Sequence, residues 1–187
     1  SNCANYGTIE GYNKVGGLFA EVNPGNSSAG VCDTRFCISV GQTRILGPSN
    51  SKGAVVGLVN LSGGDKAHQM DVYYNHSQIG IGYVQNGLAP QSNITKTSDE
   101  TFATGEICIR LNEANSLYSK ESEHIDGRPI WGQKLGVDRY PSLFSDNEIL
   151  YKVEANNSEF FVYENQVLPK LTLQDKYYFH SPTTFSV

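Results

Sequence analysis

The side chains whose types could do chemistry are concentrated between residues 119 and 148. This stretch holds the only tryptophan of the chain beside polar groups with planar donors and acceptors: His124, Asp126, Arg128, Trp131 and Gln133. A sugar has an apolar face that stacks on an aromatic ring and a hydroxyl rim that needs paired donors and acceptors. The pattern therefore predicts a carbohydrate-binding site formed by these five residues. The alternative is that Trp131 fills the end of a hydrophobic core.

The same stretch contains carboxylates that could act as an acid and a base. A glycosidase needs two carboxyl groups about 5 to 9.5 Å apart across its sugar, and Glu121, Glu123 and Asp126 are the candidates. Neighbouring loop positions do not fix that separation. The chain has neither a Gly-x-Ser-x-Gly elbow nor a phosphate-binding P-loop. We expect no catalytic residues and no cofactor, with a glycoside-active enzyme as an alternative.

A second group of polar residues has the types that bind metals. Asp65, His68 and Asp71 follow one another at intervals of three, and His76 lies nearby. On a helix these side chains would share a face, but a strand distributes them over two faces. Because we expect strands here, we predict no metal site.

Four cysteines, an even number, permit three pairings: Cys3, Cys32, Cys37 and Cys108. Their presence in a chain rich in Gly, Ser and Asn favours an oxidising compartment. We predict two disulfides, Cys3 with Cys32 and Cys37 with Cys108. A short Cys32–Cys37 loop is the alternative, as are buried free thiols.

Alternating apolar residues predict the strands that hold two of these cysteines. Residues 36–41 and 105–111 each place apolar side chains at every second position, the period of a half-buried strand. Residues 54–61 are almost continuously apolar, as in a strand buried on both faces. A helix is expected at 112–122, with Asn112 as its N-cap.

Residues 70–74 and 79–84 read as two strands joined in a hairpin. Gly80 and Gly82 leave one face of the second strand without side chains. We expect a neighbouring strand, a bulge or an aromatic ring to pack there, with a bound ligand as the alternative.

About ten to twelve short strands at regular spacing, together with the absence of a detectable repeat, predict the fold class. We expect an all-β chain: a two-sheet antiparallel sandwich of the jelly-roll or lectin-like kind, with one short helix near 112–122. Residues 1–187 would then form a single recognition domain, as part of a larger extracellular protein.

One segment supports the sandwich by resemblance. The run from Trp131-Gly132 to Asn165 resembles the second half of a galectin-type lectin sandwich, in which Trp-Gly precedes two strands and their turns. The Glu and Arg that follow the tryptophan in that family are replaced here by Lys134 and Gly136. The resemblance covers less than a third of the chain and implies a sandwich, without a galactoside site.

The composition restricts the class of partner. Hydrophobic residues make up 39% of the chain and charged residues 18%, with a formal net charge of -5. Nucleic acids and anionic membranes need clustered Lys and Arg, so neither is an expected partner. No run approaches the roughly 20 apolar residues that span a bilayer. Asn-x-Ser/Thr triplets, which accept glycans in secreted proteins, occur at Asn26, Asn60, Asn75, Asn93 and Asn156.

Together these features predict a secreted or cell-surface adhesin, an attachment domain that binds carbohydrate on a cell-surface glycan or glycoprotein. The alternative is a structural or protein-binding module of a surface assembly, which pairs with other subunits through its sheet edges.

Overall fold

The computed structural model describes residues 1–23, 32–49, 51–60, 68–75, 77–85, 92–119, 129–143, 150–153 and 177–179. The chain forms two compact units: unit 1, Ser1–Asp99, and unit 2, Glu100–Val187. This division does not test whether residues 1–187 act as one recognition domain, which stays a prediction.

Unit 1 is built from short strands. In chain order they are β1 (Ala4–Asn5), β2 (Ile9–Gly11), β3 (Lys14–Gly16), β4 (Phe19–Val22), β5 (Cys32–Ser39), β6 (Thr43–Ile45), β7 (Ser51–Gly53), β8 (Val56–Asn60), β9 (His68–Tyr74), β10 (Ile81–Gln85) and β11 (Ser92–Lys96). All described pairings between them are parallel, in the orders β1-β5-β9-β11, β4-β8-β10, β2-β6 and β3-β7.

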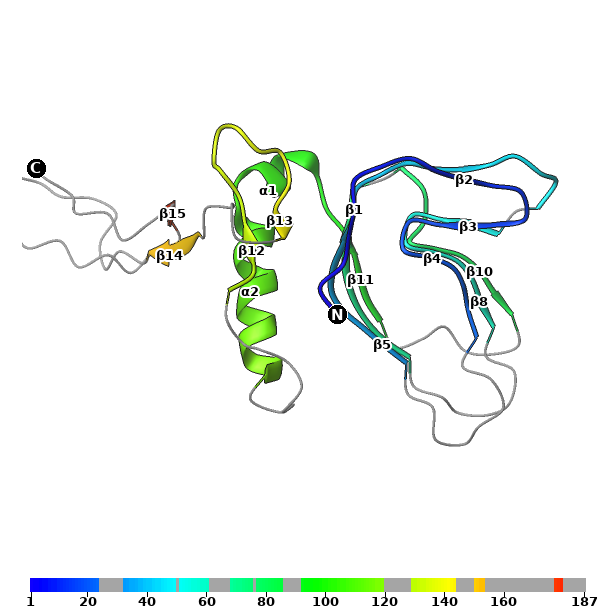
Figure 1. The fold of residues 1–187 in the computed structure, drawn as a ribbon, viewed down its shortest axis with the longest axis horizontal. Helices are drawn as coiled ribbons and strands as arrows, with labels where there is room; N and C mark the ends of the chain where they lie inside the picture. Colours follow the sequence, from blue (N-terminus) through cyan, green and yellow to red (C-terminus); the bar gives the residue numbers. More distant parts are fainter. Residues whose placement is uncertain are drawn as a thin grey trace, which may run out of the picture. The chain divides into compact units, whose positions relative to one another are not determined.

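The pairings define a stack of coils. Ala4 pairs with Ile38 and Phe19 pairs with Val56, so the chain returns to the neighbouring position 34 and 37 residues later. Strands β1 to β4 form the first coil and β5 to β8 the second, while β9 and β10 belong to the third (Figure 1). This arrangement, in which each coil hydrogen-bonds to the next, is that of a parallel β-solenoid.

The prediction of a two-sheet antiparallel sandwich is therefore wrong. Alternation of apolar and polar residues marks a strand but does not say in which direction its partner runs. The prediction that 54–61 is buried on both faces is confirmed for residues 54–59, which are all buried. Continuous burial of this kind is typical of parallel sheets, whose two faces are both covered.

The predicted hairpin of 70–74 with 79–84 is also wrong. Strand β9 pairs with β5 and β11, whereas β10 pairs with β8, so the segment between them turns a corner of the coil. The prediction that a neighbouring strand, a bulge or an aromatic ring packs on the bare glycine face is confirmed, with a neighbouring strand at Gly82. A Cβ on Gly82 would lie 2.5 Å from the backbone N and C of Lys52.

The core of unit 1 lies between β5 and β9 on one side and β4, β8 and β10 on the other. Its buried members are Val22, Cys37, Ala54, Val55, Val56, Val59, Met70, Val72 and Tyr74. Burial of these side chains supplies most of the favourable free energy of folding for such a stack.

Unit 2 combines helices with short antiparallel strands. Its elements are α1 (Asp99–Ala103, which begins at the boundary between the units), α2 (Glu106–Ser119), β12 (Trp131–Gly132), β13 (Ser142–Leu143), β14 (Tyr151–Val153) and β15 (Tyr177–Phe179). Strand β12 pairs with β13 and β14 pairs with β15, both antiparallel.

The strand predicted at 105–111 is a helix in the structure. Ile107, Cys108, Leu111 and Asn115 are all buried, and their spacing of one, four and eight residues describes one face of a helix. Residues 112–119 of the helix predicted at 112–122 therefore form the second part of α2, and residues 120–122 lie outside the described residues. The helix begins at Glu106 because Gly105, with a φ of 84°, ends α1, and its carbonyl oxygen accepts the first hydrogen bond of α2, from the Ile109 N–H (3.1 Å). The Glu106 N–H also donates to the Thr104 hydroxyl (3.4 Å).

Candidate functional site

A regular exposed surface of unit 1 is formed by β2, β6 and the residues that flank them. We call it the β2/β6 face, and it consists of Thr8, Glu10, Tyr12, Gln42, Arg44 and Leu46, all of which are exposed. Alternate residues of an extended strand point to the same side. Since Glu10 pairs with Arg44 in the parallel register, the six residues form three successive rows of two.

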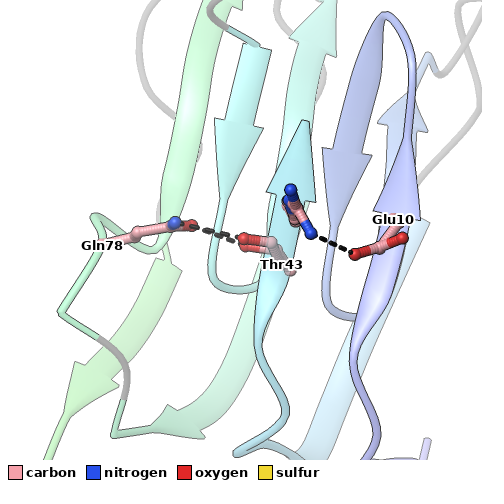
Figure 2. A network of polar contacts seen from close by, with 4 residues as sticks. Glu10, Thr43 and Gln78 are labelled. Atoms are coloured by element: carbon pink, nitrogen blue, oxygen red, sulfur yellow. Dashed lines mark hydrogen bonds and ion pairs between the residues drawn. The ribbon is translucent and has the colours of Figure 1, made fainter. Parts of the chain in front are cut away.

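An ion pair occupies the middle row. The Arg44 Nη1 donates to Glu10 Oε1 over 3.2 Å, and the two side chains are 69% and 45% exposed (Figure 2). Such an exposed pair adds little to stability. A guanidinium carries five N–H donors in a fixed plane, so the exposed Arg44 retains donors that can bind a planar or hydroxyl-rich ligand.

An apolar row lies next to the ion pair. Tyr12 is 65% exposed and Leu46 is 56% exposed. The Leu46 N–H donates to the carbonyl oxygen of Gly11 (2.7 Å), which fixes the two coils at this point. A Cβ on Gly47 would lie 2.9 Å from Tyr12 Cδ1, so glycine at this position lets the phenol ring lie close to the second coil.

Side-chain hydrogen bonds fix strand β6 of this surface to the third coil. The buried Thr43 donates through Oγ1 to Gln78 Oε1 (2.5 Å), and Gln78 Nε2 donates to the Thr43 carbonyl oxygen (3.2 Å) (Figure 2). Two bonds between the same residues restrict rotation of both. The strand that carries Arg44 is therefore fixed to the third coil as well as to the first.

Two of the predicted ligand-binding residues are fully buried. Trp131 and Gln133 have exposed fractions of 0%. The Asn112 amide holds the backbone beside the indole: its Oδ1 accepts from the N–H groups of Ile130 (3.1 Å) and Trp131 (3.0 Å), and its Nδ2 donates to the Trp131 carbonyl oxygen (2.9 Å). Because its indole is buried, Trp131 has no exposed ring face on which a ligand could stack, and it fills the core of unit 2 instead. Asn112 lies inside α2 and is not its N-cap; its side chain fixes the backbone at Trp131 through hydrogen bonds.

Gln133 has a similar structural role. Its Nε2 donates to the carbonyl oxygens of Phe102 (2.8 Å) and Asp138 (3.1 Å), which ties α1 to the segment after β12. The other predicted binding residues, His124, Asp126 and Arg128, lie outside the described residues. Their role stays a prediction.

Three of the four cysteines are free thiols in the structure: Cys3, Cys37 and Cys108. The predicted Cys3–Cys32 and Cys37–Cys108 disulfides are not formed, and neither is the alternative Cys32–Cys37 loop, because each of these bonds would need one of the free thiols. The side chain of Cys32 lies outside what the structure describes. Burial raises the pKa of both Cys37 and Cys108 to about 12, since a thiolate is poorly solvated in an apolar interior.

The remaining candidates for chemistry fall largely outside the described residues, as Asp65, His76, Glu121 and Glu123 do. In the part of the chain that is described, no three side chains of His, Cys, Asp or Glu approach closely enough to hold a metal ion. None of the described helices has the length and apolar character needed to cross a membrane.

Sequence reasoning missed the β2/β6 face because it missed the coil repeat. Residues 15–23 read Val-Gly-Gly-Leu-Phe-Ala-Glu-Val-Asn and residues 52–60 read Lys-Gly-Ala-Val-Val-Gly-Leu-Val-Asn. The structure aligns these two runs residue by residue. Comparison of the sequence with itself at a shift of 34 to 37 residues is the signal that would have found it.

Comparison with known proteins found no relative of this chain. No family model, no curated protein and no solved structure matches the chain.

Proposed function

We propose that unit 1 is an extracellular recognition domain whose β2/β6 face binds carbohydrate on a cell-surface glycan or glycoprotein. The single observation that supports this proposal is the exposed Tyr12 ring in the row beside the ion-paired Glu10 and Arg44. An aromatic ring, a guanidinium and a carboxylate are the groups that a sugar needs for stacking and for paired hydrogen bonds.

The support of this face favours binding by a preformed surface. The rows are fixed by parallel pairing of β2 with β6 and by the two hydrogen bonds between Thr43 and Gln78. A surface that does not have to become ordered loses less conformational entropy when a ligand binds. The net charge of -5 suits a neutral or cationic partner better than a polyanion.

A glycan array followed by titration of the selected glycan tests the proposal. We expect Tyr12→Ala to weaken binding by about tenfold or more, because an aromatic anchor commonly supplies at least that much. Tyr83→Ala is the matched control, since Tyr83 is a similarly exposed tyrosine (49%) on β10, away from the β2/β6 pair. An array without any bound glycan, or equal losses in the two variants, would overturn the assignment.

A second function is favoured by a different observation, the open edges of the stack. In the described pairings β11 bonds only to β9, and the first-coil strands β1 to β4 each bond on one side only. Unpaired strand edges can accept a strand from another chain. Unit 1 would then be a structural or protein-binding module of a surface assembly.

Lys14 on β3 and Lys96 on β11 carry charge at these edges, a common device against indiscriminate pairing. Association through an edge would therefore be selective. Measurement of molar mass by light scattering over a wide concentration range separates this function from the first. A chain that stays monomeric, with no partner captured in cross-linking, argues against assembly.

A further inference from the structure

We propose that Cys3 and Cys37 form a disulfide that fastens the first coil of unit 1 to the second when the protein meets an oxidising disulfide. The inference is independent of ligand binding by the β2/β6 face. It assigns a pairing that differs from the two disulfides expected from the sequence.

The strand register places the two cysteines side by side. Ala4 pairs with Ile38, so Cys3 and Cys37 precede paired residues in neighbouring coils. The Ile38 N–H donates to the Cys3 carbonyl oxygen (2.9 Å), and the Cys3 N–H donates to Cys37 Sγ (3.3 Å). Adjacent strands lie about 4.8 Å apart, and disulfides join Cα atoms separated by about 4.4 to 6.8 Å.

The backbone also gives both side chains the same direction. The residue before each cysteine has a positive φ, 58° at Asn2 and 57° at Phe36, and the Asn2 N–H donates to the Arg35 carbonyl oxygen (2.9 Å). The same backbone conformation therefore recurs in both coils. Residues in register on parallel strands point to the same side, so the Cys3 side chain lies over that of Cys37.

The two thiols differ in access, which defines the order of the reaction. Cys3 is exposed, whereas Cys37 is fully buried beneath the first coil and in register with Val72 of the third. Desolvation is the largest cause of the raised pKa of Cys37, and the neighbouring Cys3 thiol contributes to the same change. An external reagent therefore meets Cys3 first.

With glutathione disulfide as the oxidant, the exchange balances. The Cys3 thiolate attacks one sulfur of glutathione disulfide, a mixed disulfide forms and one glutathione thiolate leaves. Cys37 then loses its proton and attacks the Cys3 sulfur, and the second glutathione thiolate leaves. The two thiols lose two electrons and two protons, and two molecules of reduced glutathione carry them away.

Reduction of this bond is expected to be slow. Attack of an external thiol on the exposed Cys3 sulfur expels the Cys37 thiolate, and a thiol of high pKa is a poor leaving group. The bond would close a loop between residues 3 and 37 and so restrict the unfolded chain. A persistent structural link is the expected result, rather than a rapidly reversible switch.

Peptide mapping without reduction tests the proposal, because the sequence separates all four cysteines. Cleavage after Lys14, Arg35, Arg44, Lys96 and Arg110 leaves Cys3, Cys32, Cys37 and Cys108 on different peptides. After treatment of the full chain with glutathione disulfide we expect peptides 1–14 and 36–44 to be linked, with a loss of about 2 Da. A link from Cys37 to Cys32 or Cys108, or four thiols that all remain open to alkylation after denaturation, would overturn it.

Stability gives a second readout. We expect oxidation to raise the thermal midpoint of unit 1 by about 5 °C or more. Cys3→Ser should abolish the shift while leaving the fold of the reduced protein unchanged, since Cys3 is exposed. Cys108→Ala is the control that should keep both the linked peptides and the shift. An equal shift in the Cys3→Ser variant would overturn the proposal.

Discussion

The two units of the chain differ in how each is stabilised internally. In unit 1 the positions that matter most for packing are those that lack a side chain, because the coils approach so closely that a Cβ at Gly16 would lie 2.6 Å from the Gly57 nitrogen and 2.8 Å from the Val55 carbonyl oxygen of the second coil. In unit 2 the decisive positions carry amides: Asn112 and Gln133 bond the backbone of the segment around β12.

This difference follows from where backbone polar groups find partners. In a parallel stack the backbone N–H and C=O groups pair between coils, so side chains are not needed as their hydrogen-bond partners. The side chains have only to pack the interior, and glycine is needed where two backbones approach closely. The segment 129–143 has little regular pairing, so buried side chains must supply the missing hydrogen bonds. Substitutions of glycine should therefore damage unit 1, and substitutions of amides should damage unit 2.

The largest effect is expected from Gly16→Ala. The added methyl group would meet three backbone atoms within 2.8 Å, and backbone cannot move aside as a flexible side chain can. We expect unit 1 to lose about 4 kcal/mol of stability. Gly7→Ala is the control, because its Cβ would have no neighbour closer than 3.9 Å.

Far-ultraviolet circular dichroism follows the strands, while the single tryptophan, Trp131, reports on unit 2 alone. We expect Gly16→Ala to lower the unfolding midpoint measured by circular dichroism and to leave the midpoint measured by Trp131 fluorescence unchanged. A variant as stable as the parent would contradict the close packing of the coils.

The next effect is expected from Asn112→Ala in unit 2. The substitution removes all three hydrogen bonds that the Asn112 amide makes with the backbone of Ile130 and Trp131, at a cost of about 3 kcal/mol for buried groups of this kind. Thermal unfolding followed by Trp131 fluorescence measures it. Glu113→Ala, an exposed neighbour on α2, should have almost no effect. Equal thermal midpoints for the Asn112→Ala and Glu113→Ala variants would contradict a stabilising role of the Asn112 hydrogen bonds.

A pH dependence is expected in both units, because burial raises the pKa of the Cys37 thiol in unit 1 and of the Cys108 thiol in unit 2. A thiol that titrates near 9.0 when unfolded and about 12 when folded keeps its contribution below pH 9 and loses it as the pH rises toward 12. Each thiol should remove about 1.4 kcal/mol per pH unit in that window. Cys108→Ala should flatten this slope for unit 2 alone, as measured by denaturant unfolding at pH 8 to 11. An unchanged slope would contradict the assigned burial.

The smallest effect is expected on the β2/β6 face. Because both partners of the Glu10–Arg44 pair are well exposed, Arg44→Ala should change stability by no more than about 0.5 kcal/mol. The same variant should weaken glycan binding if the proposed function is correct. A large loss of stability without any change in binding would show that the pair is structural.

Parts of this fold could be predicted from local sequence alone. The continuous apolar run at 54–61 predicted a strand buried on both faces, and Gly80 and Gly82 predicted close packing of a neighbour. The alternation of apolar and polar residues at 105–111 led to the wrong prediction of a strand, because a run of seven residues fits a strand and one face of a helix about equally well. The Glu106–Arg110 pair, four residues apart, was the local signal in favour of the helix.

The sequence by itself determined the strand-rich character of the chain, the burial of 54–59 and the net charge of -5. These properties depend on residue type and short-range order. The tertiary structure decided which strands pair, that Trp131 is buried, and that Glu10, Tyr12, Arg44 and Leu46 share one surface. Parallel pairing joins residues 22 to 37 positions apart through backbone hydrogen bonds, which every residue except proline can form on both sides. Side-chain patterns therefore left the choice of partner open until the coils were stacked.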